Sequence, residues 1–329
     1  MGALLGGLPV GGCAVPRAGF LGPPAVRTQH PVELTVLDLT PRTGRVLPAG
    51  EILLRGQSAL TNQLLFRRSP TDEPFRFDGE ILRLTGLVRV GLGGGFDLEA
   101  TPGATLAGPG FLDEPVDQFH DFFGLPGGLR NQVEKDGYTM SIDKNGGPIY
   151  RLERDQLLAN DLPLILSRQF LAQDRRGWEP DLLARIALEV PTGSYGKGTG
   201  NGGWDFGAGL AASKEFGLSE FAATVSLVAP HTPGRVERQD GEYQWRLSGS
   251  LNAELPLTEE LTVLLHLQAH RSVLAEMKAG RLSRNQVLFW AGGRWDLGGG
   301  TFAELLLGEG ITQKISPDFT LFLCLGTRF

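Results

Sequence analysis

The sequence of 329 residues predicts an all-β fold: a transmembrane antiparallel β-barrel of about 12 strands, with short periplasmic turns and long extracellular loops. Three observations support this prediction. Runs of strand length recur along most of the chain, and their side chains alternate between apolar and polar. The connections between the runs are short and long in turn. The chain also ends inside the last run, on the aromatic residue Phe329.

Composition narrows the choice of fold class. No apolar run approaches the ~18 residues of a membrane-spanning helix, whereas membrane strands leave a weaker signal. The net charge is -6 and no basic cluster with interleaved aromatic residues occurs, so we expect no nucleic-acid partner. The two cysteines, Cys13 and Cys324, could pair in principle, but they make neither a metal site nor a disulfide framework. We expect no cofactor and no metal ion.

The N-terminal part precedes the strand-like runs. Residues 1–28 are small and apolar like a signal peptide, but glycines interrupt them and no basic residue comes first. They are therefore a poor, signal-like or disordered segment. The letters VGGC, ending at Cys13, loosely resemble a lipoprotein cleavage box, and the sequence does not decide whether this cysteine is lipidated. Residues 29–49 are expected to form a periplasmic segment.

Residues 50–329 are expected to form the barrel. Each run is near the ~9–11 residues that a tilted strand needs to cross a bilayer, and none has a helical stripe. The runs cover residues 50–62, 80–92, 96–107, 161–171, 180–191, 203–214, 219–230, 243–255, 261–273, 284–296, 301–311 and 319–329.

Alternation, loop lengths and aromatic residues each test this assignment. In the run 243–255, Tyr243, Trp245 and Leu247 begin an apolar face, and the opposite face is polar. A soluble sandwich alternates too, but its connections have no reason to be sorted by length. Here the tight connection 93–95 stands between the long loops 63–79 and 108–160. Rings at strand ends are typical of the membrane interface.

The long loop 108–160 contains a predicted short helix near 113–124. Asp113 can cap it, Pro115 suits its first turn and Gly124 ends it. Its apolar face suggests either a lid over the barrel mouth or a helix packed on the rim. The candidate lid residues are Phe119, His120, Phe122 and Phe123.

Several stretches resemble a known family: LPAGEILL (47–54), GFLDEPVDQFHDFFGLPGG (110–128) and PTGSYGKGTGNGGWDFGAGLAAS (191–213). They resemble bacterial proteins catalogued as domain of unknown function 3187 and grouped with membrane β-barrels. The final FTLFLCLGTRF resembles the C-terminal signal that barrel-assembly machinery reads. The likeness covers most of residues 29–329. It implies a barrel in the bacterial outer membrane, with outer-membrane lipids and the assembly machinery as partners, and it implies no activity.

With the apolar faces turned to lipid, charges of both signs face the lumen. This arrangement fits salt bridges that make the barrel rigid, or a hydrated path for small polar solutes. His266 and His270 would lie ~13 Å apart along one strand, too far for one metal ion. The predicted lumen-lining residues are Arg55, Arg83, Arg89, Glu99, Arg185, Glu189, Asp205, Arg246, Glu254, His266, His270 and Arg294.

These features favour a passive channel for small solutes. One alternative is a structural or adhesive surface barrel without transport. A less favoured alternative is an outer-membrane lipid hydrolase, which needs a serine and a histidine together on the lipid-facing surface. The outward Ser58 has no histidine near it in the pattern, so we expect no catalytic residue.

Deletion of Phe329 should impair assembly far more than any activity. The last strand must pair with the first, because an open edge in lipid leaves backbone groups unsatisfied. The measurement is the amount of heat-modifiable, folded barrel recovered from membranes. A truncated chain that assembles as well as the full chain would contradict this role of the C-terminal residue.

Overall fold

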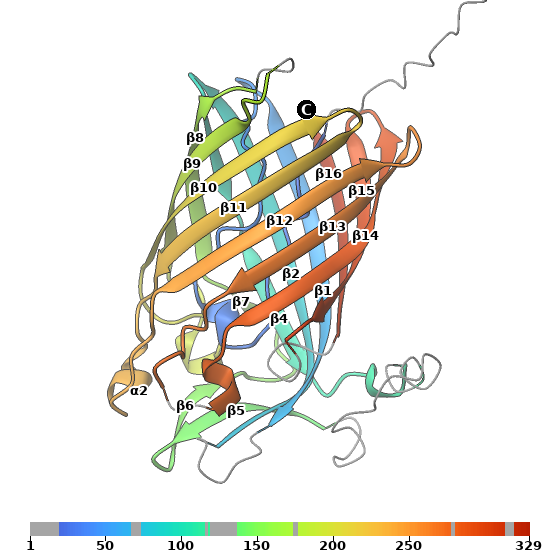
Figure 1. Cartoon of the computed structure of the whole chain (residues 1–329). Coiled ribbons are helices and arrows are strands. Elements are labelled where there is room, and N and C mark those ends of the chain that lie inside the picture. Colours follow the sequence, from blue (N-terminus) through green and yellow to red (C-terminus); the bar gives the residue numbers. More distant parts are fainter. Residues whose placement is uncertain are drawn as a thin grey trace, which may run out of the picture.

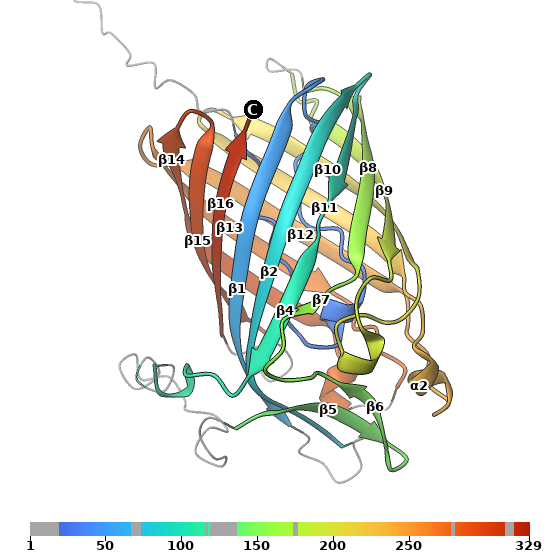
Figure 2. The same cartoon turned by 180° about the vertical axis from the view of Figure 1, so that it is seen from behind.

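The protein forms a closed, twelve-stranded antiparallel barrel, seen from two sides in Figures 1 and 2. The computed structural model describes residues 20–66, 74–115, 118, 137–173, 177–277, 280–312 and 319–329. Within these ranges, no helix is long and apolar enough to cross a membrane.

Each run expected from the sequence is a strand of the barrel wall. Most are continuous: β1 (Ile52–Phe66), β2 (Phe75–Gly93), β9 (Asp181–Val190), β10 (Asp205–Phe216), β11 (Ser219–Ala229), β12 (Arg246–Pro256), β13 (Leu261–His270), β14 (Gln286–Gly298), β15 (Thr301–Gly310) and β16 (Phe319–Arg328). Two are interrupted: β3 (Phe96–Ala100) continues as β4 (Gly103–Gly108), and β7 (Leu158–Ala159) continues as β8 (Leu162–Leu171).

The C-terminal residue completes the seam of the barrel. Strand β1 pairs with β2 on one side and with β16 on the other. The Phe329 N–H donates to the Ile52 carbonyl at 2.9 Å, and the Ile52 N–H donates back at 3.2 Å. Beside this pair, Arg328 forms an ion pair with Glu51 at 2.5 Å. The sheet therefore closes on itself up to the last residue, and β1 presents no free edge there.

The two ends of the barrel differ in their connections. One end, called the short-turn end here, has tight turns such as those at Gly94, Gly217 and Gly299, whose φ angles are 61°, 61° and 60°. Glycine suits these turns because it adopts positive φ without steric cost. The other end, the long-loop end, carries 3-10 helices η3 (Tyr195–Lys197) and η4 (Gly280–Ser283), helix α2 (Gly234–Glu237) and the hairpin of β5 (Thr139–Lys144) and β6 (Gly147–Arg151) (Figure 1).

The longest loop differs from its prediction. It contains the hairpin β5–β6 in addition to a helical stretch, and β5 pairs with the part of β2 before residue 80, where no strand was expected. Asp113–Pro115 and Gln118 are helical, in agreement with the predicted position of a helix. The candidate lid residues Phe119, His120, Phe122 and Phe123 lie outside the described residues, so their role stays a prediction.

Residues 20–47 lie inside the barrel, where a periplasmic segment had been expected for 29–49, and residues 48–50 are exposed at the short-turn end. Residues 20–47, called the lumen segment here, run from the short-turn end to the 3-10 helix η1 (Glu33–Thr35) near the long-loop end. The segment then returns to the short-turn end, where the chain enters β1 (Figures 1 and 2). Residues 26–39 are buried along their whole length. The expected signal-like segment 1–28 overlaps the lumen segment from residue 20, and residues 1–19 lie outside the described part.

The wall is apolar outside and mixed inside. Leu247, Leu251 and Phe206 are half or more exposed on the outer face, as alternation predicts. The prediction is wrong for Tyr243, which is buried at the long-loop end because β12 begins only at Arg246. An apolar cluster joins Val26 and Leu47 of the lumen segment to the inner face of the wall. Its wall members are Leu53, Ala59, Leu87, Leu264, Leu288, Trp290, Phe302, Leu306, Phe322 and Cys324.

A second apolar cluster lies at the long-loop end and includes Leu34 of the lumen segment, Ile142 and Tyr150 of the hairpin, and Leu274 after β13. Tyr138, just before β5, donates from its hydroxyl to the Leu152 carbonyl at 2.8 Å, and burial raises the pKa of this hydroxyl. Tyr150, on β6, donates to the Pro31 carbonyl at 3.2 Å, which joins the hairpin to the lumen segment. The loops at this end therefore pack on the turn of the lumen segment as well as on one another.

Gly308→Val should destabilise the barrel. A Cβ atom at this inward position of β15 would lie 2.3 Å from the ring of Trp290, which is fully buried. Overpacking of this kind costs about 1–3 kcal/mol. The measurement is the midpoint of heat-modifiable migration. Gly56→Ala is the matched control, because its Cβ would meet nothing closer than 3.9 Å. Equal midpoints for the two variants would contradict this packing.

Candidate functional site

The central feature of the lumen is an ion-pair cluster between β12 and the lumen segment. Arg246 Nε lies 3.2 Å from Glu33 Oε2, and Arg246 Nη1 lies 3.2 Å from Asp38 Oδ1. A second arginine, Arg27, has its Nε 3.6 Å from Asp38 Oδ2. The Arg246 and Glu33 side chains are fully buried. Two arginines and two carboxylates thus balance one another inside the long-loop end of the barrel.

The sheet register explains why Arg246 needs a partner from outside the wall. On β11 its neighbour is Val228, and β13 on the other side contains no carboxylate at all. An arginine side chain in the barrel interior that lacks a counter-charge is costly. Glu33 and Asp38 of the lumen segment supply that counter-charge, so their position follows from the pattern of the wall.

The turn of the lumen segment is held by its own side chains. The Arg27 guanidinium donates to the carbonyls of Glu33 at 2.6 Å and Val36 at 2.8 Å, which joins the two limbs. Glu33 in turn accepts a hydrogen bond from the Val273 N–H at 3.1 Å, just beyond β13. The turn is therefore fixed both internally and to the barrel.

At the short-turn end the charges are reversed. Here the lumen segment supplies the cations and the wall supplies the carboxylates. Arg42 forms a bidentate ion pair with Asp97 of β3 and donates to Ser167 Oγ at 2.7 Å. Arg45 pairs with Glu220 of β11 and, at 3.0 Å, with Glu215 of β10. Arg45 is more exposed than Arg42, so its pairs contribute less to stability.

Other wall arginines bind the backbone of the lumen segment. Arg185 Nη1 donates to the Thr40 carbonyl at 2.6 Å, and Arg55 Nη1 donates to the Pro23 carbonyl at 3.3 Å. Arg294 donates to the Gly22 carbonyl and also forms ion pairs with Glu254 at 2.5 Å and Glu304 at 2.7 Å. These contacts satisfy carbonyl groups that no strand pairs.

No backbone–backbone hydrogen bond joins residues 20–47 to a wall strand in the part of the chain that the structure describes. The attachment of the lumen segment therefore depends on side chains and apolar packing. A ladder of backbone bonds, as in the wall, would be independent of sequence. Here each contact depends on a particular residue.

The structure places all the predicted lumen-lining residues in the barrel interior, and it brings most of them into contact with the lumen segment or with one another. Asp205 accepts a hydrogen bond from the Leu37 N–H at 2.9 Å, and Arg89 pairs with Glu99 at 2.6 Å. His266 and His270 are buried on β13, and His266 hydrogen-bonds Asn252. Their part in a solute path stays a prediction. Among the described residues, no group of His, Cys, Asp or Glu is arranged to hold a metal ion.

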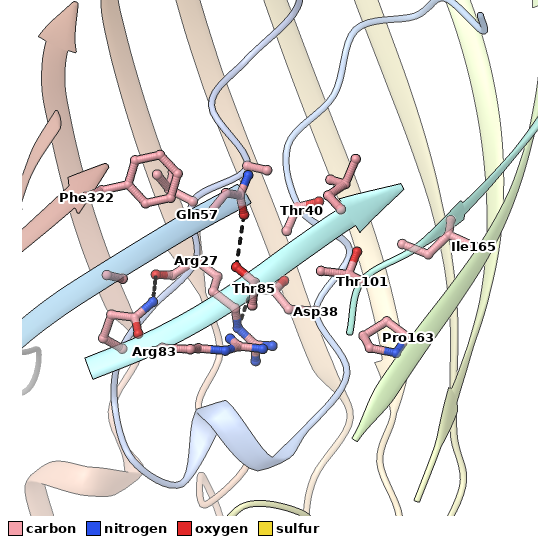
Figure 3. Close-up of a pocket in the computed structure, with 15 residues that line it drawn as sticks. Arg27, Asp38, Thr40, Gln57, Arg83, Thr85, Thr101, Pro163, Ile165 and Phe322 are labelled. Carbon is pink, nitrogen blue, oxygen red and sulfur yellow. Dashed lines mark hydrogen bonds and ion pairs between the residues drawn. The ribbon is translucent and has the colours of Figure 1, made fainter. Parts of the chain in front are cut away.

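Sequence reasoning missed the contribution of the lumen segment. Arg27, Glu33, Asp38, Arg42 and Arg45 were not among the candidate residues. One signal in the sequence could have indicated it. Arg246 is predicted to face inward, but β13 contains no acidic residue to pair with it, so its partner had to come from outside the wall. The segment leaves a cavity of about 30 Å³ beside β1 and β2 (Figure 3).

Comparison with known proteins agrees with the fold. A family model described as "Protein of unknown function (DUF3187)" matches residues 15–329. The chain belongs to this family. No curated protein sequence matches it. The family match confirms the resemblance expected from the motifs at 47–54, 110–128 and 191–213.

Solved structures with a similar fold are outer-membrane barrels. The COG4313 outer membrane channel from Pseudomonas putida F1 has 12% sequence identity and a TM-score of 0.57, over 89% of this chain and 100% of that one. The NanC porin (7% identity, TM-score 0.46, 84% and 98% coverage) and the P. putida toluene transporter TodX (12%, 0.40, 86% and 91%) are more distant. This DUF3187 chain therefore has the fold of an outer-membrane β-barrel.

Arg246→Gln should release the lumen segment. The substitution leaves Glu33 and Asp38 buried without their main partner, which costs about 3–5 kcal/mol. The measurements are the unfolding free energy in urea and the rate at which a protease cleaves residues 20–49. Arg271→Gln is the matched control, because its pair with Glu276 is exposed and such pairs contribute about 0–1 kcal/mol. Adding Glu33→Gln should restore part of the loss. Equal losses for Arg246→Gln and Arg271→Gln would contradict the central cluster.

Proposed function

We propose that this DUF3187 protein is an outer-membrane channel for small polar solutes and that the lumen segment keeps it closed. The observation that supports the proposal most directly is the attachment of this segment. It fills the lumen, yet no backbone–backbone hydrogen bond joins residues 20–47 to a described wall strand. A segment held by side chains can leave while the wall stays intact, because the backbone hydrogen bonds between wall strands are independent of it.

The wall beneath the lumen segment suits water and polar solutes. Departure of the segment exposes Arg246 and Arg185 on one part of the wall, and Asp97 and Asp181 on another. Water solvates such charges once the lumen is open, and rings of charge of both signs then select among polar solutes. A barrel of this strand number lies between the filled eight-stranded barrels and the 16–18-stranded aqueous porins.

The proposed setting is the bacterial outer membrane. The likeness to outer-membrane barrels supports it, as does the outward apolar face with Trp245 and Trp295 near strand ends. Short turns lie on the periplasmic side of such barrels, which puts both limbs of the lumen segment at the periplasmic mouth. Outer-membrane lipids and the barrel-assembly machinery are the proposed partners.

A structural barrel without transport is the second candidate. The buried ion pairs of Arg42, Arg246 and Arg294 favour it, because many strong contacts suit a segment that stays in the lumen permanently. The two candidates differ in one property. A channel conducts when the lumen segment is removed, whereas a barrel that is filled for rigidity loses stability and gains no selective conductance.

Removal of residues 20–44 should convert a mostly silent barrel into a steady conductor in planar lipid bilayers. Substitutions that only weaken binding of the lumen segment should raise the open fraction by a smaller amount. Each ~1.4 kcal/mol lost from segment binding raises this fraction about tenfold. Asp38→Asn, which weakens the pairs with Arg246 and Arg27, is the graded variant. Arg271→Gln, at an exposed pair, is the control and should conduct like the full chain. A folded deletion variant that stays electrically silent and admits no solute into liposomes would refute the channel.

A further inference from the structure

One arginine of the wall is left without a counter-charge by the contacts described above. Arg83, on β2, is only 5% exposed, and no carboxylate lies within 4 Å of it among the residues that the structure describes. Its register neighbours are Ala59 on β1 and Thr105 on β4, both uncharged. The carboxylates of Asp38 and Glu189 act on it only from a greater distance. The wall therefore buries a cation here that it does not neutralise.

A second arginine lies close to Arg83. Figure 3 shows the guanidinium groups of Arg27 and Arg83 next to each other at the edge of the lumen cavity. Asp38, which also lines the cavity, already pairs with Arg27 and with Arg246, and Glu189 acts on Arg27 and Arg83 only from beyond 4 Å. Two like charges in a poorly hydrated interior repel each other unless something negative lies between them.

The same cavity has more free donors than free acceptors. Arg83 Nε and Gln57 Nε2 are buried and have no hydrogen-bond partner in the described structure, whereas Arg27 Nε faces the Asp38 carboxylate at 3.6 Å. All four side chains line the cavity. Gln57 accepts from Thr85 through its oxygen at 3.1 Å, and Figure 3 shows its amide nitrogen on the side away from Thr85. Gln29 Oε1 is the one free acceptor among these lining side chains. A surplus of donors beside two cations is the chemistry of an anion site.

The size of the cavity limits the ligand. Its volume is about 30 Å³, whereas one water needs roughly 10–15 Å³ measured in the same way. A monatomic anion fits this space. Sulfate and phosphate, with five heavy atoms each, exceed the roughly two or three water-sized positions that this volume offers while the lumen segment is in place.

We propose that this cavity is a halide site, in which one chloride-sized anion lies between the guanidinium groups of Arg83 and Arg27 and accepts hydrogen bonds from them. Arg83 belongs to the wall and Arg27 to the lumen segment, so the anion joins the segment to β2. The site belongs to the closed barrel and does not depend on whether the protein conducts. Chloride concentration then sets part of the stability of the lumen segment.

The first test is crystallographic. Crystals of the full chain grown in sodium bromide should show an anomalous difference peak between the guanidinium groups of Arg27 and Arg83. The same crystals of Arg83→Gln should lack this peak. A wild-type structure with only water in the cavity would overturn the proposal, and this result does not require any variant to fold.

The second test measures stability at constant ionic strength. Replacing sodium gluconate with sodium chloride should raise the midpoint of heat-modifiable migration, because a ligand that binds only the folded state stabilises it as its concentration rises. Arg83→Gln should remove this dependence. Arg168→Gln is the control, since Arg168 is exposed and lies over the Phe96 ring at 5.3 Å, outside the lumen. A chloride response that persists in Arg83→Gln, or is absent from the wild type, would overturn the proposal.

Discussion

The need to pair charge inside a sealed barrel determines most of this structure. Arg246 has no acid within reach on its neighbouring strands, and Asp97 of β3 has its bidentate cation, Arg42, on the lumen segment. The lumen segment completes both sets, with carboxylates near its turn and arginines near its return to β1. Because the two sets have opposite signs and lie at opposite ends of the barrel, a shift of the segment along the axis would break both. Charge pairing thus sets the position of the lumen segment along the barrel axis, in the same way that hydrogen-bond register sets the position of a strand in a sheet.

The backbone of the wall strands needs no hydrogen bond from the lumen segment. Closure between β1 and β16, completed at Phe329, satisfies the backbone of the seam, and even the interrupted strand β3–β4 keeps its bonds. The Pro102 carbonyl, for instance, still accepts from the Gly86 N–H at 2.9 Å. A segment inside such a wall can contact only side chains, because the backbone groups of the wall are already paired. The affinity of the segment for the wall therefore depends on its sequence.

The sequence predicted the wall better than it predicted what fills the wall. Alternation with a period of two is a local property of each run, and it placed Arg185, Arg246 and Arg294 inside correctly. The lumen segment has no such period, because it touches the wall on all sides and pairs with no strand. Its charges look like those of any polar linker until the partners of each wall residue are known. The hairpin β5–β6 was missed for a related reason, since its short strands lie within a loop and outside the wall.

The course of the lumen segment has a topological consequence. Both of its limbs meet the same mouth of the barrel, and only the turn at Glu33–Thr35 reaches the far end (Figures 1 and 2). A chain that ran from one mouth to the other would have to thread a free end past the wall in order to leave, which protein chains avoid. A loop that enters and leaves the barrel through the same mouth needs no threading. It can be withdrawn and reinserted by translation along the barrel axis, tethered throughout at Gly50, without opening a single strand.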